Sequence, residues 1–208
     1  MPEAAARELV EWGVTTRCRR GEAISGDLAV VILRPEGALV AGIDGLGHGR
    51  EAARAASRAA EVVRASASQD LVLLAERCHA ALRGTRGAAI SLAFVSSSTS
   101  EMTWLGVGNV EGRVLSGDPS TKRRLKGSLA LQRGVPGHEL PAMRTATLGV
   151  RPGDVLALAT DGIRAAFADS LDITGSTQAI SERILTEHRR SADDDALAVA
   201  VRYLGLRP

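Results

Sequence analysis

The alternation of hydrophobic and polar positions first becomes regular near residue 27. Residues 27–33 are rich in aliphatic side chains, Arg34-Pro35-Glu36-Gly37 has the composition of a turn, and residues 38–43 are apolar again. Two such runs around a short turn that contains Pro and Gly predict a β-hairpin.

The hydrophobic period then becomes that of a helix. From Arg50 onward one face collects small apolar side chains: Ala52, Ala53, Ala56, Ala59, Ala60 and Val63. A second apolar stripe predicts a helix from about Gln69 to Leu82, and Gly84 is a stop signal; the stripe consists of Leu71, Leu74, Cys78 and Leu82.

Strand patterns dominate the rest of the chain. We expect strands at residues 88–96, 101–107, 112–115, 155–159 and 196–204, a short helix ending at 168, and a helix over about 176–190. Residues 116–145 predict mostly loop with one or two short strands. Because strands and helices do not alternate as βαβαβ, the order predicts an antiparallel α+β layered domain. No repeat or linker divides the chain, so we expect one domain over residues 1–208.

The composition excludes several classes of protein. The chain has 208 residues, is 45% hydrophobic and carries a formal net charge of +2, which argues against disorder and against attraction to nucleic acid or anionic membranes. Nucleic-acid binding through stacking needs aromatic side chains on a basic groove. The chain has five scattered aromatic residues: Trp12, Phe94, Trp104, Phe167 and Tyr203. We therefore expect no nucleic-acid partner.

The chain shows no feature of a membrane or secreted protein. No apolar run approaches the ~20 residues that span a bilayer, and the first residues are charged and lack an apolar signal core. Two cysteines, Cys18 and Cys78, do not make a disulfide framework. We expect a cytoplasmic protein with two reduced thiols, of which Cys78 lies in the core.

Acidic residues recur where predicted strands begin or end. Asp27 opens a strand, Asp44 and Asp161 close strands, and the run 193–195 precedes the last strand. Adjacent strand ends lie only ~5 Å apart, and carboxylates that converge repel one another unless a cation lies between them. Oxygen ligands suit Mg²⁺ or Mn²⁺. Two such ions can share a carboxylate and activate water for in-line attack on a phosphate.

Each of these features has a simpler interpretation when it is taken alone. An Asp-Gly pair is more often a turn than a ligand, and an acidic run is usually a solvated loop. The segment 44–49 is neither a Walker A loop nor a dinucleotide fingerprint. His79, His138 and His188 lack metal-ligand spacing. The basic cluster at 122–126 is most simply a solvated loop face, and Cys18-Arg19-Arg20 lacks the phosphate loop of a cysteine-dependent phosphatase.

Taken in order, however, four short motifs resemble a known family. They are Ser25-Gly26-Asp27, Asp44-Gly45-Leu46-Gly47-His48-Gly49, Thr160-Asp161-Gly162 and Asp194-Asp195-Ala196. This order resembles the metal-dependent protein phosphatases of the PPM type, in particular their SpoIIE-like branch. The short length and the Trp12-Gly13 beginning are similar to the RsbX-type stressosome phosphatases. The resemblance extends from about Glu11 to Arg202.

The resemblance implies a fold, a site and a reaction. The fold would be an αββα sandwich of two antiparallel sheets flanked by helices. Asp44 would bridge two Mn²⁺ or Mg²⁺ ions, Gly45 would offer its carbonyl, Asp161 and Asp194 would bind the second ion, and Asp27 would act on the side of the first. Asp44, Asp161 and Asp194 would be the catalytic set. His48 is not assigned as a ligand. The reaction would be hydrolysis of phosphoserine or phosphothreonine on STAS-domain proteins in a stress-response pathway.

The chain also departs from the family pattern. The family often has Thr two residues after the paired aspartates, where this chain has Leu197. The register within Asp193, Asp194 and Asp195 is therefore open, and Asp194 is preferred because of the length of the strand that follows. Arg17, Arg19 and Arg20 lie near the family's phosphate-binding arginine, and no motif match selects one.

A binding module of the same fold without activity is the alternative function. A module that only binds a phosphoprotein has no need to keep the acidic set. The presence of all four carboxylate positions, at Asp27, Asp44, Asp161 and the 193–195 run, therefore favours the enzyme.

Overall fold

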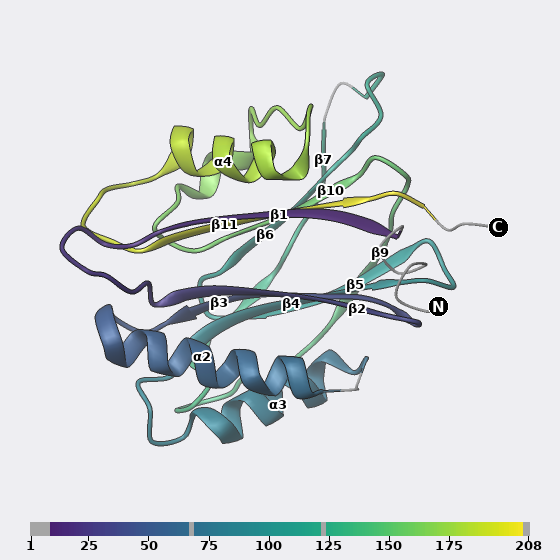
Figure 1. Cartoon of the computed structure of the whole chain (residues 1–208). Coiled ribbons are helices and arrows are strands. Elements are labelled where there is room, and N and C mark those ends of the chain that lie inside the picture. The colour runs from purple at the N-terminus through teal and green to yellow at the C-terminus, as the bar shows by residue number, and fades with distance from the viewer. Residues whose placement is uncertain (1–8, 67–68, 122–123, 206–208) are drawn as a thin grey trace.

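Two β-sheets stacked face to face form the centre of the molecule, with helices on both outer faces (Figure 1). The computed structural model describes residues 9–66, 69–121 and 124–205. The first sheet has the order β1-β11-β10-β6-β7. Its strands are β1 (Val10–Arg17), β11 (Ala196–Tyr203), β10 (Val155–Ala159), β6 (Glu111–Leu115) and β7 (Leu125–Ser128).

The second sheet has the order β2-β3-β4-β5-β8, and β9 also pairs with β5. Its strands are β2 (Asp27–Arg34), β3 (Gly37–Gly45), β4 (Ala88–Ser96), β5 (Glu101–Val107), β8 (Leu131–Gln132) and β9 (Ala146–Gly149). The pairings are antiparallel except for the short parallel contact between β5 and β8. The sandwich predicted by the resemblance is confirmed.

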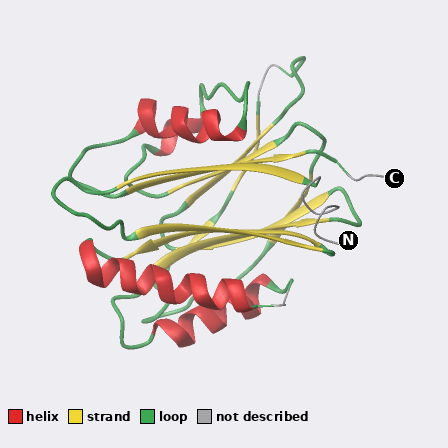
Figure 2. Ribbon diagram, in the orientation of Figure 1, coloured by secondary structure: helices red, strands yellow, loops and turns green. Residues whose placement is uncertain are grey.

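Helices cover both outer faces of the sandwich, as Figure 2 shows. Helices α2 (Gly49–Ala65) and α3 (Leu71–Leu82) pack on the second sheet. Helix α4 (Thr177–His188) and the short 3-10 helix η1 (Ala165–Ala168) pack on the first. Asp70 caps α3 by accepting hydrogen bonds from the N–H groups of Val72 and Leu73. No helix in the described ranges is long and apolar enough to cross a membrane.

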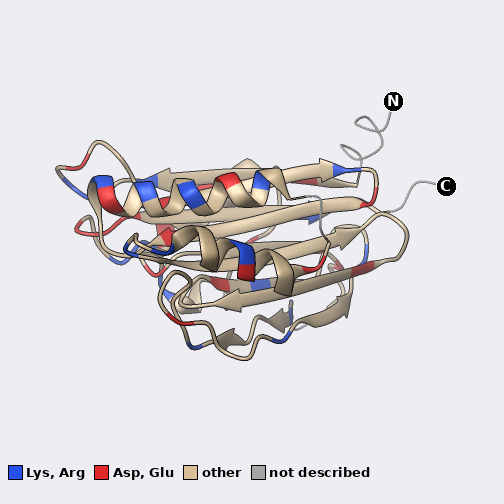
Figure 3. Cartoon of the chain, turned by 90° about the horizontal axis from the view of Figure 1, so that it is seen from below, with Lys and Arg blue, Asp and Glu red and all other residues tan. Residues whose placement is uncertain are grey.

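The alanine-rich face of α2 lets this helix approach its sheet closely. Ala52, Ala55, Ala56, Ala59 and Ala60 are all buried, and Cys78 of α3 is buried in the same cluster, as predicted. The sequence pattern placed Ala53 on this face, whereas the structure buries Ala55 instead and leaves Ala53 only partly covered. Charged residues of α2, such as Arg54, Arg58 and Glu61, are exposed, and Figure 3 colours the charged positions along the ribbon.

The predicted hairpin and the strands expected after it are confirmed, whereas β1 and the short β9 were not predicted. The hairpin pairs Asp27 with Asp44 at its open end and Arg34 with Gly37 at its turn. Strand β1 was not predicted, because it lies at a sheet edge with Trp12 exposed and Gly13 without a side chain. Gly13 is required there since a Cβ atom would lie 2.3 Å from the backbone nitrogen of Gln178 in α4. Because α4 packs this closely on β1, position 13 has to be glycine, and the hydrophobic pattern of the strand is interrupted there.

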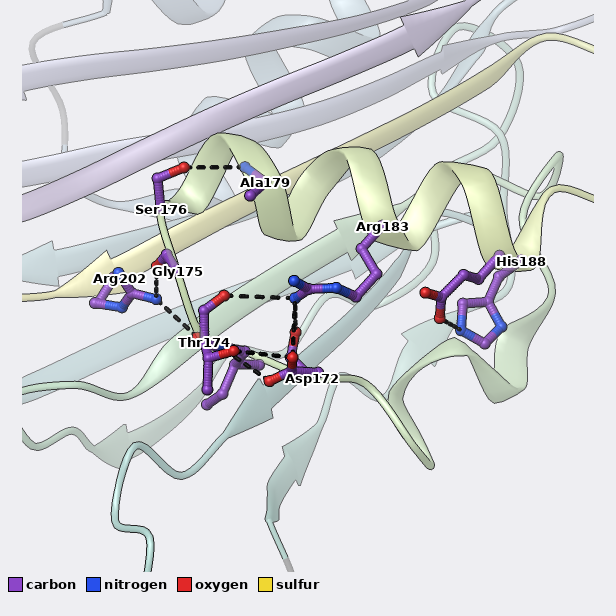
Figure 4. Close-up of polar contacts among 10 residues, drawn as sticks. Asp172, Thr174, Gly175, Ser176, Ala179, Arg183, His188 and Arg202 are labelled. Atoms are coloured by element: carbon purple, nitrogen blue, oxygen red, sulfur yellow. Dashed lines mark hydrogen bonds and ion pairs between the residues drawn. The ribbon is translucent and has the colours of Figure 1, made fainter.

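Two arginine side chains hold the segment that leads into α4 (Figure 4). Arg183 Nη1 donates to the carbonyl of Thr174 at 3.4 Å. Arg202 Nη2, on β11, donates to the carbonyls of Ile173 and Gly175, each at 2.8 Å. These bonds satisfy backbone oxygens of a loop with no secondary structure of its own, and they tie α4 to the sheet beneath it.

We expect Arg202→Ala to lower the free energy of unfolding by about 1–2 kcal/mol, because the variant leaves carbonyl groups without their donors and removes the pair with Glu11. Urea denaturation followed by circular dichroism measures this change. Arg54→Ala, at an exposed position of α2, is the matched control and should change stability by less than ~0.5 kcal/mol. Equal stability of the two variants would contradict the role given to Arg202.

Candidate functional site

Aspartates from the two sheets gather at one end of the sandwich. Asp27 and Asp44 lie directly opposite each other on β2 and β3 of the second sheet. Asp161 follows β10 and Asp194 precedes β11, so both belong to the first sheet. The negative charges of Asp161 and Asp194 both act on Asp44. The four positions selected from the sequence are therefore neighbours in the fold.

The carboxylates of this cluster have no ion-pair partner among the described residues. Burial, followed by the charge of Asp44, raises the pKa of Asp27 to about 8. Burial, followed by the charges of Asp161 and Asp194, raises the pKa of Asp44 to about 7. Burial and the charge of Asp161 also raise the pKa of Asp194.

An oxygen-only donor set with excess negative charge suits hard divalent cations. In the described part of the chain, no three acidic, His or Cys side chains already form a closed ligand group. The aspartates are neighbours in the fold, and the chemistry of the donor set fits a divalent cation.

Hydrogen bonds through Thr160 join the two sheets at this end. Thr160 Oγ1 donates to Asp27 Oδ2 at 2.7 Å, and the N–H of Leu197 donates to Thr160 Oγ1 at 2.9 Å. Thr160 is almost completely buried. The sequence motif included Thr160 without a role, and the structure makes it the connection between Asp27 of one sheet and β11 of the other.

The three consecutive aspartates at 193–195 have different surroundings. Asp195 is buried, and its two carboxylate oxygens accept the N–H groups of Arg19 at 2.7 Å and Gly26 at 2.8 Å. Asp193 is exposed and bonds to Ser191. Asp194 is exposed and lies in the field of Asp161. Asp195 thus holds a loop while its charge also acts on Asp27 and Asp44. Asp194 is the exposed member whose charge acts on Asp44 and is opposed by that of Asp161.

The glycines that follow Asp44 and Asp161 make room for a neighbouring backbone. A Cβ atom on Gly45 would lie 2.1 Å from the carbonyl oxygen of Ala52, and one on Gly162 would lie 1.9 Å from that of Asp195. Neither glycine has a positive φ. Glycine is required at both positions because the backbone of another segment lies where a side chain would be. A special backbone conformation is not the reason.

Asn109 is a site residue that sequence reasoning missed. Its Nδ2 donates to Asp161 Oδ2 at 2.6 Å, and its hydrogen bond to Asp44 counteracts the rise in the pKa of that carboxyl. Asn109 lies in the loop after β5. The rule that selected the aspartates, a polar residue directly beyond a strand, would have found it if it had been applied to amides.

The structure distinguishes the three arginines near the amino terminus. Arg19 attracts Asp194 and lowers its pKa in opposition to the effect of burial. Arg17 Nη1 donates to the neighbouring carbonyl of Thr16, and Arg20 is exposed. Arg19 is thus the one whose charge acts on the acidic cluster.

The histidines have structural partners. His48 Nδ1 lies 3.1 Å from Glu22 Oε1, and His79 Nδ1 accepts the N–H of Gly137. His138 Nε2 bonds to the carbonyl of Arg86. His188 also lies apart from the cluster, at the end of α4. Of the basic cluster at 122–126, residues 122 and 123 lie outside the described residues.

We expect the metal-free protein to lose thermal stability between about pH 5 and about pH 9. The pKa values of about 8 for Asp27 and about 7 for Asp44 lie above the ordinary value of 3.8. The folded state therefore holds protons that the unfolded state has released, and the stability this gives at low pH is lost as the pH rises through the folded values. Asp27→Asn, which keeps an acceptor for Thr160, should flatten the slope of Tm against pH.

Thermal denaturation in EDTA measures this slope. Asp193→Asn removes an exposed charge from the same end of the molecule and should keep the slope of the wild type. Identical slopes for the wild type and Asp27→Asn would contradict the conclusion that protonation of Asp27 stabilises the fold at low pH.

Comparisons with known proteins agree with the fold and the motifs. The family model described as Stage II sporulation protein E (SpoIIE) matches residues 34–204. "Phosphoserine phosphatase RsbX" of Bacillus subtilis (strain 168) is 30% identical over 92 residues, which are 44% of this chain and 46% of that protein. The match thus spans about half the length of this curated relative.

Two solved structures superpose over nearly the whole chain. One, described as "The bacterial stressosome: a modular system that has been adapted to control secondary messenger signaling", has a TM-score of 0.82 and 30% identity over 93% of this chain and 99% of its own. The other, RsbX in complex with magnesium, has a TM-score of 0.76 and 22% identity over 93% and 95%. Because the family model covers most of the chain, this protein belongs to the SpoIIE family of PPM-type phosphatase domains.

Proposed function

We propose that this chain is a divalent-metal-dependent protein phosphatase that hydrolyses phosphoserine or phosphothreonine. The observation that carries the proposal is the gathering of Asp27, Asp44, Asp161 and Asp194 from both sheets, without a cationic partner in an ion pair. The name of the Bacillus subtilis relative, a phosphoserine phosphatase, supports this reaction class.

The acidic cluster is the proposed site for two Mn²⁺ or Mg²⁺ ions. Asp44 is the shared ligand, the carbonyl of Gly45 and the carboxylate of Asp27 belong to the side of the first ion, and Asp161 and Asp194 belong to the second. Such ions lower the pKa of water and neutralise charge on phosphate oxygens. The crystal structure of RsbX with magnesium supports the choice of cation.

The chain's own contribution is to hold the carboxylates in place against their repulsion. Thr160 fixes Asp27 through its hydroxyl, and Asn109 fixes Asp161 through its amide. Asp195 fixes the loop that contains Arg19 and Gly26 beside the last strand. With these groups positioned before substrate arrives, little reorganisation accompanies the reaction.

Arg19 is the proposed phosphate-binding residue among the three arginines near the amino terminus. A guanidinium offers several donors in a plane that matches the oxygens of a phosphate. Arg19 is partly buried and its charge acts on Asp194. It can therefore contact a phosphoryl group that approaches the carboxylates, whereas Arg20 is exposed.

Phosphorylated STAS-domain proteins of a cytoplasmic stress-response assembly are the proposed substrates. The similar structure described as belonging to the bacterial stressosome supports this choice. A phosphoprotein-binding module without activity remains the outcome that the first experiment below would favour if no phosphate were released.

We expect Asp44→Asn and Asp194→Asn each to lower metal-dependent hydrolysis of p-nitrophenyl phosphate by at least about 100-fold, because each removes a charged ligand from the proposed ion site. Asp193→Asn is the matched control and should keep near-wild-type activity, since Asp193 bonds to Ser191 at the surface. Initial rates are measured with Mn²⁺, with Mg²⁺ and with EDTA.

The comparison of Asp193→Asn with Asp194→Asn also tests which of these two aspartates binds the ion. Loss of activity in Asp193→Asn with retention in Asp194→Asn would reverse the assignment. No activity of the wild type with either ion, combined with tight binding of a phosphorylated STAS-domain protein, would make the protein a binding module.

We expect Arg19→Ala to raise the KM for p-nitrophenyl phosphate about tenfold, because one charge-assisted contact to phosphate is worth roughly 1.4 kcal/mol. Arg20→Ala should leave KM within about twofold of the wild type. Steady-state kinetics at saturating Mn²⁺ separates KM from kcat. Equal changes of KM in Arg19→Ala and Arg20→Ala would contradict the assignment of phosphate binding to Arg19.

A further inference from the structure

The second glycine of the Asp44–Gly49 motif lies beneath an arginine side chain. Gly47 has a φ of 90°, and a Cβ atom on it would lie 2.6 Å from Nη1 of Arg86. Arg86 comes from the loop between α3 and β4. The motif that contains Asp44 therefore leaves room for a guanidinium three residues further along the loop.

The backbone around Arg86 is fixed on two sides. The N–H of Leu46 donates to the carbonyl of Gly87 at 3.0 Å, which ties Arg86 to the Asp44 loop. On the other side, His138 Nε2 bonds to the carbonyl of Arg86 at 2.9 Å. A Cβ atom on Gly87 would lie 2.7 Å from the carbonyl oxygen of Pro136. A tightly packed loop thus presents this side chain.

The guanidinium of Arg86 is exposed, and no described residue accepts a hydrogen bond or forms an ion pair with it. An arginine that served the fold would donate to loop carbonyls, as Arg189 does to those of Cys18 and Asp194. Five donors of Arg86 therefore remain for a ligand. Arg86 lies over Gly47, three residues along the loop from Asp44, and the hydrogen bond between Leu46 and Gly87 keeps the two loops together.

We propose that Arg86 determines substrate specificity by binding an acidic side chain next to the phosphorylated residue. This inference rests on the proposed phosphatase function. A phosphoryl group at the carboxylates of Asp44 and Asp194 would place the flanking residues of the substrate over the mouth of the site, where the Gly47 loop and Arg86 lie. A guanidinium binds a carboxylate through two parallel hydrogen bonds, and the surrounding aspartates would repel an acidic flank that had no such partner.

The test compares two synthetic phosphoserine peptides that differ in their flanks, one with Asp residues and one with Asn at the same positions. The readout is kcat/KM from phosphate release with Mg²⁺, with p-nitrophenyl phosphate as a substrate that has no flank. We expect the wild type to prefer the acidic peptide, and Arg86→Ala to lose about fivefold to tenfold on that peptide through KM. The Asn peptide and p-nitrophenyl phosphate should change by less than about twofold.

Two variants control for charge and for geometry. Arg83→Ala removes an exposed arginine from the same loop and should leave all three substrates unchanged. Arg86→Lys keeps the charge without the planar pair of donors and should restore part of the preference. Thermal denaturation confirms that each variant is folded.

The outcomes separate this inference from the proposed function. Equal loss on all three substrates would place Arg86 in the phosphate site and overturn the inference, as would no loss on the acidic peptide. Absence of phosphate release by the wild type from every substrate would instead refute the proposed function, and the role of Arg86 with it.

Discussion

Repulsion among carboxylates at one end of the sandwich is the constraint around which this structure is organised. Asp27 and Asp44 face each other across a strand pair, and Asp161 and Asp194 approach from the other sheet. Like charges held this closely raise one another's pKa and weaken the fold as they ionise. The surrounding hydrogen bonds supply the compensation: Thr160 and Asn109 donate to Asp27 and Asp161, and Asp195 accepts the backbone N–H groups of Arg19 and Gly26 and so fixes their loop.

Close packing makes this arrangement possible. The glycines at 45 and 162 lie where another backbone occupies the position of a side chain, and the alanines of α2 bring that helix near the strand that ends in Asp44. Any larger side chain would separate the sheet ends and the helix, and the carboxylates with them. The small residues of this chain therefore act on the chemistry indirectly, through the distance between elements.

In the proposed function, two arginine side chains near the acidic end would divide the recognition of a phosphoprotein between them. Arg19 is partly buried and acts on Asp194, which suits a phosphoryl group. Arg86 is exposed over Gly47, which suits a flanking residue of the substrate. Separate positions for the two charges would let the enzyme bind phosphate generally and still distinguish among phosphoproteins.

The sequence by itself determined the hairpin, the helix pair and the four acidic positions, because these depend on local periodicity and on residue types at strand ends. The sandwich class followed from the resemblance of the ordered motifs to a known family. The sequence did not determine β1, whose pattern is weakened by Gly13 under α4, nor the role of Asn109, which arises from a contact 52 positions away along the chain. It left open which of three aspartates and which of three arginines face the site. Tertiary structure gives these neighbours different surroundings, since residues in one loop differ only in where the rest of the fold directs them: Asp195 accepts two backbone N–H groups from a distant loop, and Asp194 lies in the field of Asp161.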